Sequence, residues 1–99
     1  MIARVWHGAT EAGKADEYVD YLNETGMSDY RATKGNQGAY ILRKIEGDTA
    51  HFYTLTFWDS FDSIKEFAGE DYERARYYPQ DEKFLLEFEP TVRHFEVFG

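Results

Sequence analysis

The chain has 99 residues, of which 42% are hydrophobic, and a formal net charge of −8. This length fits one domain, residues 1–99, that buries roughly 60–70% of its unfolded surface. The acidic balance argues against nucleic acid or an anionic membrane as a partner, because both need a basic stripe. The absence of cysteine removes disulfides, thiolate nucleophiles and soft metal sites. Because no apolar run has membrane-spanning length and the N-terminus does not resemble a signal peptide, we expect a cytoplasmic protein.

The first part of the chain predicts a strand, a helix and a loop. Residues 2–7 have the composition of a strand, and Thr10 is the expected cap of a helix start. Between residues 15 and 22 the apolar side chains recur at helical spacing, and Gly26 is a stop signal. Residues 27–38 have no sustained period and contain Gly35, Asn36 and Gly38, so we expect a loop there.

The second part predicts a hairpin, a helical region and a last strand. Residues 39–46 and 49–58 read as strands joined by a turn at Gly47-Asp48. Asp59 or Ser60 should cap a helix over residues 61–68, and Gly69 should end it. Residues 70–78 and 80–88 are expected to be two further helical pieces separated by Pro79, before a strand over residues 91–98. The predicted order is therefore β-α-β-β-α-β.

This order favours a ferredoxin-like α+β fold, a four-stranded antiparallel sheet with helices on one face. We expect the first and last strands to be neighbours and the first strand to run parallel to the third. Residues 53–58, Tyr-Thr-Leu-Thr-Phe-Trp, carry apolar groups on both faces of their strand. The helices can cover only one face, so the other needs a partner subunit or a ligand.

The alternation of residues along the strands sorts the side chains into two faces. The purely apolar face is expected beneath the helices, and the mixed face at a subunit interface where Arg4, His94 and Glu96 satisfy one another. The opposite assignment is open, because it rests on polarity alone. The apolar face comprises Ala3, Val5, Leu55, Phe57, Phe95 and Val97, and the mixed face Ile2, Arg4, Trp6, Thr54, Thr56, Trp58, Val92, His94 and Glu96.

Several segments resemble the antibiotic biosynthesis monooxygenase family. They are Thr-Phe-Trp-Asp-Ser at 56–60, Val-Arg-His-Phe-Glu-Val at 92–97, and the stretches 67–69 and 75–79, which look like an uncharacterised branch. The resemblance covers essentially the whole chain. It implies a homodimer whose sheets meet face to face as a dimeric α/β barrel, with a pocket in each subunit between sheet and helices. The superfamily includes cofactor-independent monooxygenases of aromatic phenols, haem degraders and proteins without a known reaction.

The haem degraders of the superfamily use an Asn, a Trp and a His at positions that align with Trp6, Phe67 and Tyr77 here. All three differ, and a tyrosine in place of the proximal histidine disfavours iron ligation by that route. The three histidines of the chain also lack the short spacing of a metal motif. We therefore expect no cofactor and no metal.

Two histidines are candidate catalytic bases. A cofactor-free oxygenase must deprotonate its phenolic substrate, and a histidine suits that task. His94 and His7 lie on neighbouring predicted strands, whereas His51 near the hairpin turn is expected to be exposed. The alternative is that each histidine is a satisfied structural residue, with Arg4 or Glu96 as the partner of His94.

Six further residues are candidates for binding a small apolar or aromatic ligand. Rings could stack on it, a phenol could hydrogen-bond it, and an arginine could anchor an oxyanion. For the aromatic residues the alternative is core packing or, for one tryptophan, the dimer interface; for the arginine it is an exposed edge strand. The six are Trp6, Trp58, Phe67, Tyr77, Tyr78 and Arg43.

Three hypotheses for function follow. The first is a homodimeric, cofactor-independent monooxygenase of a small aromatic or polyphenolic compound. The second is a non-catalytic protein of the same fold that binds a small molecule or serves as an accessory subunit. The third is a structural dimer with a filled core, which the absence of a pocket beside Tyr78 would favour.

Overall fold

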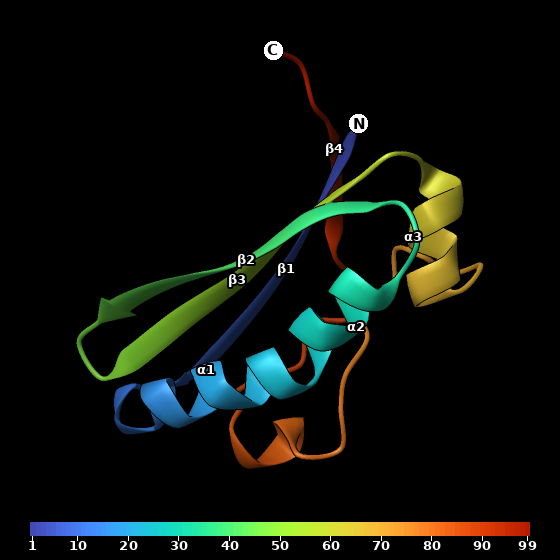
Figure 1. Cartoon of the computed structure of the whole chain (residues 1–99). Coiled ribbons are helices and arrows are strands. Elements are labelled where there is room, and N and C mark those ends of the chain that lie inside the picture. Colours follow the sequence, from blue (N-terminus) through green and yellow to red (C-terminus); the bar gives the residue numbers. More distant parts are fainter.

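The computed structural model describes residues 1–99 as an antiparallel sheet with its helices on one side (Figure 1). The strands are β1 (Ile2–Glu11), β2 (Asn36–Glu46), β3 (Thr49–Trp58) and β4 (Arg93–Glu96), in the sheet order β2-β3-β1-β4. This topology confirms the predicted ferredoxin-like fold. The expected parallel pairing of the first and third strands is wrong, because β1 pairs antiparallel with both β3 and β4. The helical crossover makes β1 and β2 run the same way, and the hairpin then reverses β3.

The helices are η1 (Ala12–Lys14), α1 (Ala15–Glu24), α2 (Gly26–Ala32), α3 (Phe61–Ala68) and η2 (Asp81–Lys83). Helix α2 lies where the sequence predicted a loop. Thr25 alone separates α1 from α2. Its hydroxyl donates to the carbonyl of Tyr21 at 2.7 Å, and the next residue begins α2. The buried side chains of Met27 and Tyr30, three residues apart, fix α2 against the sheet. None of these helices is long and apolar enough to cross a membrane.

Residues 69–92, which we call the covering segment, contain one regular element, η2. The helical piece predicted over 70–78 is therefore wrong, and the piece predicted over 80–88 is reduced to the single turn η2. The backbone of the segment instead bonds to distant residues: Ala75 N donates to Pro90 O at 2.9 Å, and Leu86 N donates to Ala9 O at 2.9 Å. Figure 1 shows the segment, coloured yellow-orange to red, running on the same side of the sheet as α1 and α2.

The helix-covered face of the sheet is the mixed face, so the expected assignment of the faces is inverted. Large aromatic residues such as Phe52 and Trp58 fill the layer beneath the helices, and both are fully buried. Buried threonines on this face find partners: Thr56 donates to Arg4 O at 3.2 Å and accepts from Trp58 Nε1 at 2.9 Å. Side-chain size and local hydrogen bonds, rather than polarity, therefore determine which face is covered.

The open face of the sheet carries the purely apolar positions. Tyr40, Leu42 and Phe95 are 56%, 47% and 51% exposed. Val5, Leu55 and Phe57 lie between them and are half-buried by their neighbours alone. The structure thus has a dry face beneath the helices and a second apolar face that this chain leaves uncovered.

Candidate functional site

The two predicted catalytic histidines lie on opposite faces of the sheet. His94 is opposite Arg4 in the β1–β4 pairing and shares the helix-covered face with it. His7 pairs with Tyr53 on β3 and faces the open side. Because the sheet separates them, the two imidazoles cannot act on one substrate molecule together.

His94 is surrounded by rings and by a cation. The centroids of Tyr72 and Phe61 lie 5.3 and 5.7 Å from the centroid of its imidazole. Burial, with a smaller contribution from the charge of Arg4, lowers the pKa of His94 to about 4. The side chain is therefore neutral at pH 7 and a weak base. Its Nε2 has no hydrogen-bond partner, and the expected mutual contact of Arg4, His94 and Glu96 does not form.

His7 belongs to a line of three polar side chains on the open face. The carboxylate of Glu89 contacts Nδ1 of His7, and Nε2 of His7 lies 3.1 Å from Nδ1 of His51. The ring of Tyr53 packs against His7 with 4.9 Å between centroids. A carboxylate at Nδ1 fixes the proton on that nitrogen, so Nε2 becomes the acceptor. This arrangement is the one that orients an imidazole for general-base work.

A hollow of about 320 Å³ adjoins His7. It exists because β4 begins only at Arg93, so β1 has no strand neighbour beyond Val5 on that side. Its volume is near the lower end of the range for small-molecule sites, roughly 300–1,000 Å³. The lining residues are Val5, His7, Tyr53, Glu89, Thr91, Val92 and Arg93.

Sequence reasoning missed two members of this site. His51 was expected to be exposed near the hairpin turn, but it is half-buried beside His7. The register of β1 against β3 would have revealed it, because His51 and Tyr53 alternate onto the face of His7. Glu89 had no such signal, because it lies in the irregular covering segment.

Four of the predicted binding aromatics are part of the packed interior. Trp58 is fully buried beneath the helices. Phe67 packs on Tyr30 with 4.6 Å between ring centroids. Trp6 is 5% exposed and meets the edge of Tyr77, whose hydroxyl donates to the carbonyl of Glu89 at 2.5 Å. These contacts favour the packing alternative for Trp6, Trp58, Phe67 and Tyr77.

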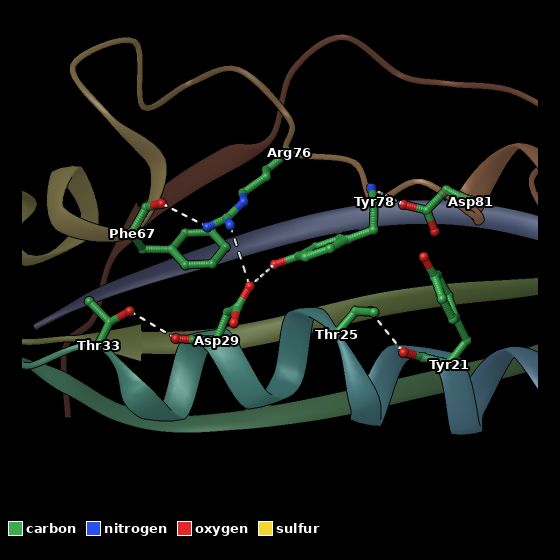
Figure 2. A network of polar contacts seen from close by, with 8 residues as sticks. All are labelled: Tyr21, Thr25, Asp29, Thr33, Phe67, Arg76, Tyr78 and Asp81. Carbon is green, nitrogen blue, oxygen red and sulfur yellow. Dashed lines mark hydrogen bonds and ion pairs between the residues drawn. The ribbon is translucent and has the colours of Figure 1, made fainter.

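Tyr78 holds the covering segment to α2 (Figure 2). Its hydroxyl donates to Oδ2 of Asp29 at 2.5 Å, and the same oxygen lies 3.4 Å from Nη2 of Arg76. Burial, together with this hydrogen bond to Asp29, raises the pKa of Tyr78. No hollow adjoins Tyr78. The expected pocket between sheet and helices is therefore not open in this structure.

The remaining candidate sites have fewer groups that could take part in a reaction or hold a cofactor. Arg43 forms a surface ion pair with Asp16 at 2.7 Å, away from either hollow, as its edge-strand alternative predicted. No group of three or more histidine and acidic side chains is arranged to hold a metal ion. A second, wide-open hollow of about 610 Å³ has a mostly polar lining: Ala32, Thr33, Lys34, Asp59, Asp62, Ser63 and Glu66.

The fold is similar to that of several solved structures. The haem degrader MhuD from Mycobacterium tuberculosis, which has two haems bound in its active site, is 18% identical; the match covers 98% of this chain and 95% of that chain, with a TM-score of 0.62. Rv0793 from the same organism is 14% identical over 99% of this chain and 95% of that chain, with a TM-score of 0.61. No family model and no curated protein sequence matches the chain. Together with the sheet order, these similarities show that the chain shares the ferredoxin-like α+β fold of MhuD and Rv0793.

Proposed function

We propose that the protein is a cofactor-independent monooxygenase of a small phenol, and that His7 is its catalytic base. The observation that carries this proposal is the carboxylate-held imidazole beside the hollow on the open face. A substrate hydroxyl that takes the place of His51 as the donor to Nε2 of His7 would lose its proton to that nitrogen. The resulting imidazolium is stabilised by Glu89, and Arg93 in the lining can attract the phenolate.

The chemistry balances without an added reductant. The phenolate gives electrons to O2, one oxygen atom is inserted at a ring C–H, and the other leaves as water. The phenol thus becomes a quinone, and both electrons that reduce the second oxygen atom come from the substrate. Deprotonation is the step that the chain must catalyse, because the anion gives up an electron more readily than the neutral phenol.

Haem does not fit the residues that this chain offers. The interior between sheet and helices has no hollow. The hydroxyl of Tyr77, at the position of the proximal histidine of haem degraders, is hydrogen-bonded to Glu89 O. Phe67 and Trp6, at the two other positions, are packed beneath the helices. The haem chemistry of MhuD is therefore not part of this proposal.

The test is O2 uptake by the purified full-length chain with a panel of phenols and hydroquinones. We expect uptake above that of buffer, and a loss of at least about tenfold in His7→Gln, since general-base catalysis contributes roughly 10²–10⁴-fold. Glu89→Gln should lower the rate and shift its pH profile. His94→Gln, which alters the other imidazole, should retain the rate. No uptake across the panel, or equal loss in His94→Gln and His7→Gln, would contradict the proposal.

The second candidate function is non-catalytic binding of a small molecule. The hollow beside His7 favours it, because this hollow can hold a small molecule whether or not a reaction follows; the closed interior beneath the helices favours the structural dimer with a filled core. A ligand that raises the unfolding temperature of the chain while no O2 is consumed would select this function. If no ligand raises the unfolding temperature and no O2 is consumed, the structural dimer with a filled core is the remaining hypothesis.

We also propose that the protein is a homodimer that forms through the open face of the sheet. Apolar patches of this kind on soluble proteins mark interaction sites. Two copies of one sheet can cover each other by twofold symmetry. His7 and Tyr53 belong to the same face, so a second copy would also shield the hollow from bulk water.

A further inference from the structure

Arg93 is the charged side chain of the hollow beside His7 that has no partner. It begins β4, lines the hollow and is exposed. None of the ion pairs of the structure includes it. The one carboxylate of the lining, that of Glu89, contacts Nδ1 of His7 instead. The guanidinium of Arg93 is therefore available to an anion from outside the chain.

The strand register places Arg93 and His7 at a fixed separation on the open face. Arg93 pairs with Val5 at the end of the β1–β4 ladder, and His7 lies further along β1 on the same face as Val5. Diagonal neighbours of this kind in an antiparallel pair are roughly 7–8 Å apart. Two polar groups at opposite ends of a single aromatic ring span a comparable distance. A cation and an imidazole in this arrangement can therefore hold the two ends of one small ring.

The surface between these two groups suits a flat ring. Tyr53 is 39% exposed, and its ring packs beside the imidazole of His7. Aromatic rings prefer to stack on one another with an offset. Val5 and Val92 add apolar surface to the lining. The volume of about 320 Å³ is at the small end of known ligand sites, roughly 300–1,000 Å³, and so suits one ring rather than several fused rings. The lining therefore combines apolar walls with one cation and one imidazole.

We propose that the ligand of this hollow is an aromatic hydroxy acid, a single ring with a hydroxyl at one end and a carboxylate at the other. The carboxylate pairs with Arg93, whose adjacent N–H groups match its two oxygens, and the hydroxyl lies toward His7. This assignment rests on the proposed function and names the substrate class of the same site. Arg93, which can attract a phenolate across the hollow, then determines specificity by direct contact with the other end of the ring. A second negative charge on the ligand is disfavoured, because Glu89 lines the same hollow.

The experiment is calorimetric titration of the full-length chain with 4-hydroxybenzoate and with its neutral analogue 4-hydroxybenzamide. We expect saturable binding of the acid and at least about tenfold weaker binding of the amide, because charge-assisted hydrogen bonds are stronger than neutral ones. In NMR spectra the methyl signals of Val5 and Val92 should shift with the acid, whereas those of Ile64, which is fully buried beneath the helices, should not. Equal binding of acid and amide, or a shift of Ile64 without Val5, would overturn the proposal.

Two variants complete the binding test. Arg93→Gln removes the cation from the lining, so it should bind the acid no better than the amide. Arg31→Gln is the matched control, because it makes the same change of charge at an exposed position of α2, across the sheet from the hollow. It should keep the preference of the parent chain for the acid. If Arg93→Gln keeps that preference as well, the proposal is wrong.

The same two compounds separate this inference from the proposed oxygenase. Binding of the acid at this hollow without O2 uptake supports the ligand class and contradicts the oxygenase. O2 uptake with the same KM for acid and amide supports the oxygenase and contradicts the ligand class. If both are correct, Arg93→Gln should raise KM for the acid and leave kcat nearly unchanged, because it removes a binding contact that is made equally before and during the reaction.

Discussion

Gly8 lies in close contact with the indole of Trp6. A Cβ atom at this position would come within 2.4 Å of Cη2 of Trp6 and 3.0 Å of Cδ2 of Leu85. Both side chains are buried, so neither can move away freely. We expect Gly8→Ala to lower the free energy of unfolding by about 1–3 kcal/mol, the usual cost of overpacking.

Urea denaturation measures this effect. Gly13→Ala is the matched control, because a Cβ there would have no neighbour within 4 Å. Its effect should stay within about 0.5 kcal/mol. Similar effects of the two substitutions would show that the contact between Gly8 and Trp6 is not as tight as the structure has it.

The low pKa of His94 makes a prediction about acid stability. Its pKa is about 4 in the folded chain, against 6.5 for an unperturbed histidine. Between these values the unfolded chain binds the proton more readily than the folded chain. The stability linked to His94 is therefore complete above about pH 6.5 and declines as the pH falls toward about 4.

We expect the imidazole signals of His94 in NMR spectra to titrate near pH 4. His94→Gln should reduce the loss of stability between pH 6.5 and 4, as followed by thermal unfolding. His7→Gln is the comparison, because His7 lies on the open face beside Glu89 and outside the contacts of His94. A titration midpoint of His94 near 6.5 would contradict the burial that the structure shows.

At the scale of elements, the sequence predicted those that depend on local signals. The hairpin turn at Gly47-Asp48, the cap at Ser60 and the end of α3 at Gly69 are all confirmed. Ser60 accepts a hydrogen bond from Ser63 N at 3.3 Å, as a capping residue should. The helices predicted within residues 70–88 were not confirmed in that form, because the conformation of the covering segment depends on distant partners. The backbone of residues 69–92 forms hydrogen bonds to β1 and between its own distant residues. The helical spacing of Tyr72 and Ala75 in the sequence does not reveal these long-range bonds.

The candidate site was predictable to a similar extent. His7 could be chosen from its residue type and its strand. The separation of His7 from His94 depends on which face of the sheet the helices cover. The polarity of the strand residues predicted the wrong face. Glu89, which completes the site, is positioned by the covering segment and has no local sequence signal.

Within the covering segment, Asp81 is a buried residue that contacts α1. It is 3% exposed, accepts from the hydroxyl of Tyr18 at 2.8 Å and from Tyr78 N at 2.7 Å (Figure 2 shows the second bond). In Asp81→Asn the amide oxygen can still accept from Tyr78 N, but the amide nitrogen can only donate to the hydroxyl oxygen of Tyr18, whose own buried proton then has no acceptor. We expect a loss of about 1–3 kcal/mol in the free energy of unfolding, the cost of an unsatisfied buried group.

Urea denaturation gives the size of this loss, and hydrogen exchange gives its location. Amide hydrogen exchange in Asp81→Asn should accelerate first in residues 69–92, because the hydrogen bond between Asp81 and Tyr18 joins this segment to α1. Glu82→Gln, one residue along and exposed, is the control and should behave like the parent chain. Unchanged stability of Asp81→Asn would show that the segment is held elsewhere.

At the scale of the whole molecule, the inversion of the two faces changes the argument for a partner. A mixed face would have required ion pairs across an interface, whereas the open face is apolar around Tyr40, Leu55 and Phe95 and has its polar side chains near His7. An apolar interface needs no specific charge pairing, and its stability comes from the area removed from water. Such an interface should be insensitive to salt and sensitive to a single buried charge.

Leu55→Lys tests this interface directly. Leu55 lies in the middle of the open face, paired with Val5 on one side and Tyr40 on the other. We expect solution scattering to give twice the 11.6 kDa chain mass for the parent chain and a single chain mass for Leu55→Lys, because a lysine there would be buried without a partner in the dimer. Ile45→Lys is the matched control: Ile45 is 51% exposed near the hairpin turn and alternates onto the other face, so its replacement should leave the dimer intact. A parent chain that scatters as a monomer would contradict the dimer, and equal dissociation by both substitutions would move the interface away from the centre of the sheet.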